Sequence, residues 1–121
     1  MSGDNLELGK TGEEAAIAYY LKQNYTILDT NWRFGHLEVD VIAENEDTIV
    51  FCEVKTRSSN CFGEPESFVT LQKQKNIIRA ANSYVLRKGI NKDVRFDVIS
   101  IIKNNNGCTL NHIPDAFCPK W

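Results

Sequence analysis

The sequence predicts one α/β domain with a central mixed β-sheet flanked by helices, in the order α-β-β-β-α-β with a further strand in the tail. Two segments carry apolar side chains at helical spacing, and the segments between and after them alternate or run apolar as strands do. The 121 residues are 42% hydrophobic, which is enough for one core of ordinary size. No linker or repeat divides residues 1–121, so we expect a single domain.

The first helix is expected to begin at Thr11, after a largely polar segment (1–10) that we expect to be flexible. Thr11 and Glu14 have the spacing of a capping box, and Asn24 is suited to end the helix in a left-handed conformation. Capping therefore explains Glu14 but leaves Glu13 without a role. An acid in the first turn also complements the helix dipole, which is the ordinary structural explanation for Glu13.

Three strands are expected to follow, over residues 25–33, 37–42 and 49–57. The polar residues 44–47 join the last two, which indicates a hairpin. A second helix is predicted from near Glu66 to a stop at Gly89. Its apolar face would contain Phe68, Leu71, Ile78, Ala81 and Val85.

The last part of the chain is predicted to contain a strand over residues 94–102 and a turn at 104–107. The tail, residues 108–121, is expected to add a short edge strand and to lie over the core through Phe117 and Trp121. Cys52 falls on a buried strand face, where a free thiol acts as a small hydrophobe. Cys108, His112 and Cys118 could be considered as zinc ligands, but their spacing matches no common zinc site. We therefore expect them to be exposed loop residues.

Bulk properties exclude some classes of function. No apolar run is long enough to cross a bilayer and residues 1–5 do not open a signal peptide, so we expect a cytoplasmic protein without a membrane partner. The net charge of −2 argues against a protein that coats nucleic acid by bulk attraction. It leaves room for a local basic patch.

The strand over residues 37–42 places its acids on one face. Alternate side chains of a strand share a face, so Leu37, Val39 and Val41 point one way and Glu38 and Asp40 the other.

The next strand repeats this division, with Val50, Cys52 and Val54 opposite Phe51, Glu53, Lys55 and Arg57. Pairing the two strands brings Asp40, Glu53 and Lys55 onto one surface. Two carboxylates about 4 Å apart repel by roughly 4 kcal/mol at an effective dielectric of 20, which favours a bound divalent cation or a proton. Metal-assisted phosphodiester cleavage uses a carboxylate pair with an adjacent lysine. The plainer alternative is a solvated Glu–Lys pair that contributes little.

A basic segment follows, with Lys73, Lys75, Arg79, Arg87 and Lys88 and no acid between Glu66 and Asp93. These residues would contact phosphates if the segment lies beside the acidic surface. The residues alone favour a solvated helix face.

Taken together, the motifs resemble the YraN-like family of uncharacterised bacterial proteins over nearly the whole chain. They are LGKTGEEAA (8–16), NWR (31–33), EVDVIA (38–43), VFCEVKTR (50–57), FG (62–63) and RFDV (95–98). That family is similar in turn to archaeal Holliday junction resolvases of the PD-(D/E)XK nuclease superfamily. The resemblance therefore implies a restriction-endonuclease-like fold.

The resemblance also implies the site. Asp40 matches the metal-binding Asp of the superfamily, Glu53 its second carboxylate and Lys55 its catalytic lysine. Glu13 matches the first-helix Glu that many resolvase-like members bring to the same metal. The backbone carbonyl of Val54 would be a further oxygen ligand, as hard cations prefer.

The chain departs from the superfamily pattern at two positions. Val39 stands where the superfamily has Pro, and Leu37 where the family usually has Gly. Glu38 matches a family Glu and is a candidate metal ligand, with a position past the site as the alternative.

The implied activity is that of an endonuclease that hydrolyses DNA phosphodiesters with Mg²⁺ or Mn²⁺. Arg57, Lys73, Lys75 and Arg79 would hold the flanking backbone, where contacts position the strand rather than read its sequence. Recognition of branched or flapped DNA is expected over sequence recognition, and resolvase-like enzymes are usually homodimers. The alternatives are a module that binds nucleic acid or protein on the same fold without cutting, and an adaptor whose acids only solvate a sheet edge.

Overall fold

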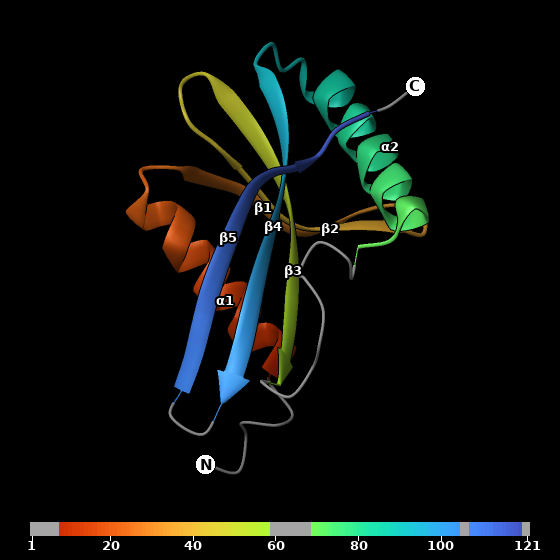
Figure 1. Cartoon of the computed structure of the whole chain (residues 1–121). Helices are drawn as coiled ribbons and strands as arrows, with labels where there is room; N and C mark the ends of the chain where they lie inside the picture. The colour runs from red at the N-terminus through yellow and green to blue at the C-terminus, as the bar shows by residue number, and fades with distance from the viewer. Residues whose placement is uncertain (1–7, 59–68, 105–106, 120–121) are drawn as a thin grey trace.

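The computed structural model describes residues 8–58, 69–104 and 107–119, which form two helices and one sheet (Figure 1). The elements follow in the predicted order. They are α1 (Leu8–Lys22), β1 (Thr26–Phe34), β2 (Leu37–Glu44), β3 (Thr48–Ser58), α2 (Leu71–Lys88), β4 (Asp93–Asn104) and β5 (Gly107–Phe117).

The five strands lie side by side in the order β1-β2-β3-β4-β5. Three neighbouring pairs are antiparallel, whereas β3 and β4 are parallel because the chain crosses over through α2 between them. The prediction of a mixed sheet in an α/β domain is therefore confirmed. In the described part of the chain, neither helix is long and apolar enough to cross a membrane.

Helix α1 begins at Leu8, so the predicted helix start with a capping box at Thr11 and Glu14 is wrong, and residues 8–10 of the segment expected to be flexible are helical. The remaining residues of that predicted segment, 1–7, lie outside the described residues. Tertiary packing explains the longer helix. Gly12 lies inside α1 against β3, where an added Cβ would overlap the hydroxyl of Thr56.

Helix α2 begins at Leu71 and not near Glu66, since Val69 and Thr70 are not helical. The Thr70 hydroxyl accepts a hydrogen bond from the Lys73 N–H (3.1 Å), which caps the first turn. Leu71 is 55% exposed, so its predicted place on the apolar face is wrong. Phe68, predicted for the same face, lies outside the described residues.

Both predicted helix stops are confirmed. Asn24 ends α1 with a φ of 69°, and Gly89 ends α2 with a φ of 63°. In each case the left-handed residue lets backbone N–H groups turn back to the last carbonyls of the helix, such as Tyr25 N–H to the Tyr20 carbonyl (2.9 Å).

Each face of the sheet has its own apolar cluster under one helix. The α2 cluster includes Phe51, Ile77 and Tyr84 and continues to the end of β5, where Phe117 stacks on Phe96 at 5.4 Å between ring centroids. The α1 cluster includes Val50 and Cys52, which confirms the predicted division of faces in β3.

Strand β2 changes faces along its length, and this corrects the predicted alternation. Leu37 and Val39 belong to the α2 cluster, whereas Val41 belongs to the α1 cluster. The change coincides with Asn31, which has a left-handed φ of 50° and lies between the pairs Thr30–Val41 and Trp32–Val39.

The tail forms a full strand rather than the short one predicted, because β5 pairs with β4 from Asn104 to Phe96. Phe117 packs on the core as expected, and Trp121 lies outside the described residues. Cys108 and His112 lie on β5, so their assignment to a loop is wrong.

Candidate active site

Strands β2 and β3 stop pairing where the predicted acids begin. Their register runs from Glu44–Ile49 to Val41–Cys52 and ends there. Asp40 and Glu53 are the next residues on each strand, and in Figure 1 β2 leads away from β3 beyond this point. The Val54 N–H donates to Asp40 Oδ2 (2.9 Å), so a side-chain carboxylate takes the place of a strand carbonyl as its acceptor.

Glu53 is buried, with 4% of its surface exposed, and its two carboxylate oxygens have different surroundings. Oε2 lies 3.5 Å from the Lys55 ammonium and 3.7 Å from that of Lys73, which reaches over from α2. Oε1 is buried and has no hydrogen-bond partner among the described residues. An unpaired buried acceptor costs about 1–3 kcal/mol, and more when it is charged.

The environment of Asp40 disfavours its ionised form. Burial raises the pKa of Asp40 from 3.8 to about 7, and the charge of Glu53 is the next contribution. The hydrogen bond from Val54 opposes this rise, whereas the charges of Glu13 and Glu38 add to it. Asp40 and Glu53 therefore form the crowded carboxylate pair that the sequence predicted.

Glu13 approaches this pair from α1. The side chain is half-buried and accepts a hydrogen bond from Asn31 Nδ2 (3.0 Å), which ties the helix to the irregular point of β1. Within residues 8–58, 69–104 and 107–119, no three His, Cys, Asp or Glu side chains are close enough to form a complete metal cage. Glu13 and Glu38 act on Asp40 through their charge, and their role as metal ligands stays a prediction.

The donors present fit a divalent cation of the Mg²⁺ type. Mg²⁺ prefers oxygen ligands and is usually bound by one or two carboxylates, with waters completing its shell. Asp40 and Glu53 supply two carboxylates, and Oε1 of Glu53 offers an acceptor that no described protein group uses. The carbonyl of Val54 stays a predicted further ligand.

The four predicted phosphate-binding residues do not gather at one place. Lys73 lies on the inner side of α2 and contacts Glu53, whereas Lys75 and Arg79 are exposed on that helix. Arg57 is half-buried near the end of β3 and has interactions of its own. The structure therefore adds Lys73 to the carboxylate pair, whereas Arg79 lies farther along α2.

Sequence reasoning missed two polar residues near the site. Ser100 is fully buried on β4, beside Lys55 in the parallel register, and its hydroxyl has no partner among the described residues. The only signal for it was one serine in an apolar strand. Asn31 was quoted only as part of a motif, and its left-handed conformation could not be read from its neighbours.

A second polar cluster lies on the α1 face, centred on the fully buried Asp97. Its carboxylate accepts hydrogen bonds from Tyr20 (2.8 Å), from Arg95 through Nε and Nη2 (both 2.9 Å) and from the Asp115 N–H (3.0 Å). His112 Nε2 lies 2.7 Å from the same carboxylate. Burial alone would raise the pKa of Asp97, but the hydrogen bonds from His112 and Arg95 hold it well below its usual range.

This cluster also corrects the interpretation of His112 as an exposed residue. Its side chain is 14% exposed, and Nδ1 lies 3.0 Å from the Tyr19 hydroxyl. Both ring nitrogens therefore have protein partners, which excludes the zinc alternative for this histidine as it is placed here.

Comparison with known proteins gives consistent matches over most of the chain. The model of the uncharacterised protein family UPF0102 matches residues 12–101. UPF0102 proteins of Bacteroides thetaiotaomicron and Christiangramia forsetii are 46% and 45% identical to this chain, over 93% and 92% of it and 93% of each relative. One from Bacteroides fragilis is 40% identical over 98% of both chains.

Proposed function

The chain belongs to the uncharacterised protein family UPF0102, the YraN-like family its motifs predicted, and we propose that it is a divalent-metal-dependent endonuclease acting on DNA. The proposal includes a restriction-endonuclease-like fold, a cytoplasmic location and a preference for branched or flapped substrates. A homodimer would account for symmetric cutting of two strands.

One observation carries the proposal. Glu53 Oε1 is buried without a partner among the described residues, beside Asp40, whose pKa the same Glu53 helps to raise. A structure that only needed a solvated acid would not bury one carboxylate next to another and leave an oxygen unpaired. A cation between the two acids would remove their repulsion and satisfy that oxygen.

The residues divide into clear roles under this proposal. Asp40 and Glu53 would hold the cation, which when bound polarises a phosphate and lowers the pKa of a coordinated water. Lys55 is held near the carboxylate pair by Glu53, where its ammonium can orient that water or stabilise charge that develops on the phosphate. Lys73 brings a second positive charge from α2 to the same place.

The test is cleavage of labelled linear, flapped and four-way-junction DNA by the purified protein in Mg²⁺ and in Mn²⁺. Wild type should cut, Asp40→Asn should not, and Asp47→Asn should cut as wild type does. Asp47 is a matched control because it is an exposed acid in the turn at the other end of β3. Equal cutting by Asp40→Asn would show that the activity belongs to another site or to a contaminant.

A specific observation favours the second candidate function, a non-catalytic binding module. Lys55 and Lys73 both contact Glu53 Oε2, so the protein itself already balances much of the acidic charge. The melting temperature of the protein with and without a divalent cation distinguishes the nuclease from the binding module. A metal site gains about 2.7 kcal/mol of stability at a cation concentration a hundredfold above Kd. Unchanged melting in Mg²⁺ and Mn²⁺ would favour the binding module.

A further inference from the structure

Helix α2 is strongly basic in a chain that is acidic overall. Its 18 residues include five lysines and arginines and no acid, whereas the whole chain has a net charge of −2. The positive charge begins with Lys73 at the candidate active site and continues to Lys88 at the other end of the helix. A helix of this kind offers a row of cations leading away from the carboxylate pair.

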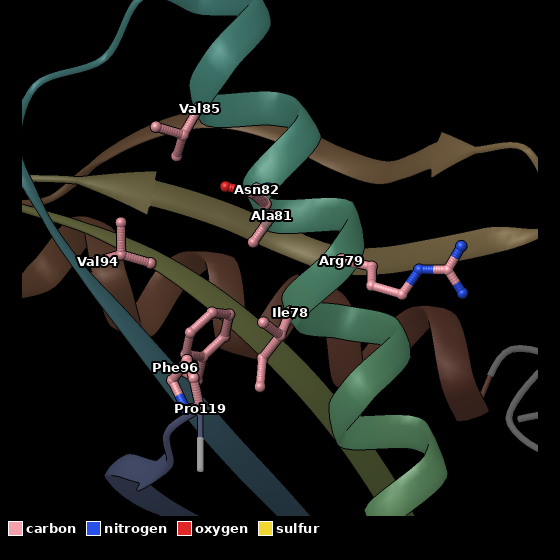
Figure 2. Close-up of a pocket in the computed structure, with 8 residues that line it drawn as sticks. All are labelled: Ile78, Arg79, Ala81, Asn82, Val85, Val94, Phe96 and Pro119. Atoms are coloured by element: carbon pink, nitrogen blue, oxygen red, sulfur yellow. The ribbon is translucent and has the colours of Figure 1, made fainter. Parts of the chain in front are cut away.

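The two flanks of α2 differ in chemistry. One flank and the start of β4 form a groove of about 400 Å³ whose lining is mostly apolar, including Ile78, Val85 and Phe96. Arg79 and Asn82 also line this groove, and Figure 2 shows the Arg79 guanidinium extending away from the apolar side chains. Arg79 is shared by both flanks, and on the other flank it is joined by a second guanidinium group, that of Arg87.

That other flank contains a second groove of about 430 Å³, which we call the α2–β1 groove. It has two guanidinium groups, an amide, a hydroxyl and one aromatic ring in its wall, and no acid. Its lining residues are Phe34, Arg79, Asn82, Ser83, Leu86 and Arg87. Leu86 is 72% exposed, so the groove also presents a large apolar side chain that a ligand could cover.

The aromatic ring of the α2–β1 groove is held in place by its neighbours. Phe34 stacks on Trp32 with the ring planes 3° apart, and Trp32 in turn packs edge-on against Tyr84 at 5.0 Å. The Arg87 guanidinium lies over the Phe34 ring, 5.1 Å from its centroid. A fixed ring beside cations is the arrangement on which unpaired bases stack while their phosphates are held.

We propose that the α2–β1 groove binds an unpaired strand of nucleic acid that continues into the candidate active site. Lys73, Arg79 and Arg87 are spaced by about 9 Å and 12 Å along the helix, given a rise of 1.5 Å per residue. This spacing lets one strand place phosphates that are about two nucleotides apart against them, with a base against Phe34. The inference deepens the proposed function and rests on it, because it assigns the single-stranded arm of a flapped or branched substrate to this groove.

The experiment measures binding without cutting. Fluorescence anisotropy with a labelled oligothymidylate, and with a duplex of the same length, is recorded for the full chain in EDTA over a range of salt concentrations. We expect the single strand to bind more tightly than the duplex. Because the chelator removes the divalent cation, the result is independent of whether the protein is a nuclease. The control Asp47→Asn, which changes an exposed acid away from both the groove and the candidate active site, should bind as tightly as wild type.

Two sets of variants locate the binding site. R79Q/R87Q should lower the magnitude of the salt slope by about 1.4, since each phosphate contact to a single strand contributes about 0.7. Phe34→Leu keeps an apolar side chain for packing but removes the ring, and should weaken single-strand binding about fivefold or more with little effect on the duplex. K22Q/K103Q removes the same charge elsewhere and should change neither.

Three results would overturn the inference. The first is that wild type does not bind oligothymidylate at low salt. The second is that K22Q/K103Q lowers the salt slope of binding as much as R79Q/R87Q does. The third is that duplex binds as tightly as the single strand and Phe34→Leu has no effect on either. The melting temperature of each variant, compared with wild type, confirms that it is folded. Single-strand binding through the groove together with a complete lack of cleavage would refute the nuclease proposal alone.

Discussion

Replacing Asp40 by Asn should stabilise the protein at alkaline pH and leave its stability unchanged in acid. Burial and the neighbouring Glu53 raise the pKa of Asp40 to about 7, so the folded state holds a proton there that the unfolded state releases near pH 4. The stabilisation from that proton is fully present below about pH 4 and is lost as the pH rises through about 7. The amide introduced by Asp40→Asn would stay neutral at every pH, and its oxygen could still accept from the Val54 N–H.

The size of the effect follows from the pKa. Each pH unit between the unfolded and folded values is worth about 1.4 kcal/mol, so a rise from 3.8 to about 7 corresponds to at most about 4 kcal/mol. Lys55, which contacts Glu53, can turn toward an ionised Asp40 and reduce the penalty. We therefore expect Asp40→Asn to gain about 2–4 kcal/mol above pH 8, or roughly 8–16 °C in melting temperature.

The assay is thermal and urea unfolding of wild type, Asp40→Asn and the control Asp47→Asn in EDTA, at pH 5 and at pH 8.5. A second series at pH 8.5 adds Mg²⁺, which should stabilise wild type and not Asp40→Asn, because the cation replaces the lost proton. A gain of equal size at both pH values would refute the reasoning, since the charge would not be its cause. A loss at both would show that hydrogen bonding to Val54 outweighs the repulsion.

Three further changes probe the rest of the fold by urea unfolding. Asp97→Asn should cost about 3–5 kcal/mol at pH 7, because it removes the buried carboxylate that pairs with the half-buried Arg95. Because the pKa of Asp97 is lowered in the folded state, its contribution to the free energy of unfolding is lost as the pH falls below about 4. The stability difference between wild type and Asp97→Asn should therefore shrink in acid, and a constant difference would contradict the lowered pKa. Gly12→Ala should cost about 1–3 kcal/mol by crowding Thr56, and Thr56→Ala in the same chain should recover most of it; no recovery would place the strain elsewhere. Gly89→Ala should cost about 1 kcal/mol, since the left-handed helix stop disfavours a side chain, and an unchanged urea midpoint would show that α2 ends in another way.

Local chemistry determined several features that the sequence alone predicted correctly. Asn24 and Gly89 end their helices because a left-handed residue there depends only on its own side chain and the preceding turn. The alternation of faces in β3 follows from the strand period, so Glu53 and Lys55 could be assigned to one side before the fold was known. The turn before β3 is likewise local, with Asn45 Oδ1 accepting from the N–H groups of Asp47 and Thr48.

Only the tertiary structure decided how these pieces meet. The pairing of β2 with β3 ends at Val41 and Cys52. Asp40 and Glu53 follow directly after this end point, and their charges interact. The change of faces at Val41 coincides with a left-handed residue on a different strand, and α1 extends past the capping signal at Thr11 and approaches β3 closely at Gly12.

The same holds for contacts between distant elements. Lys73 reaches Glu53 because the crossover between the parallel strands β3 and β4 places α2 over the part of β3 that contains Glu53. His112 lies next to Asp97 because of the register in which β5 pairs with β4. Helix stops, turns and strand faces are determined by interactions within a few residues, so the sequence specifies them directly. Register, crossover and helix placement depend on contacts between residues tens of positions apart, whose free energies are settled only when the whole core packs.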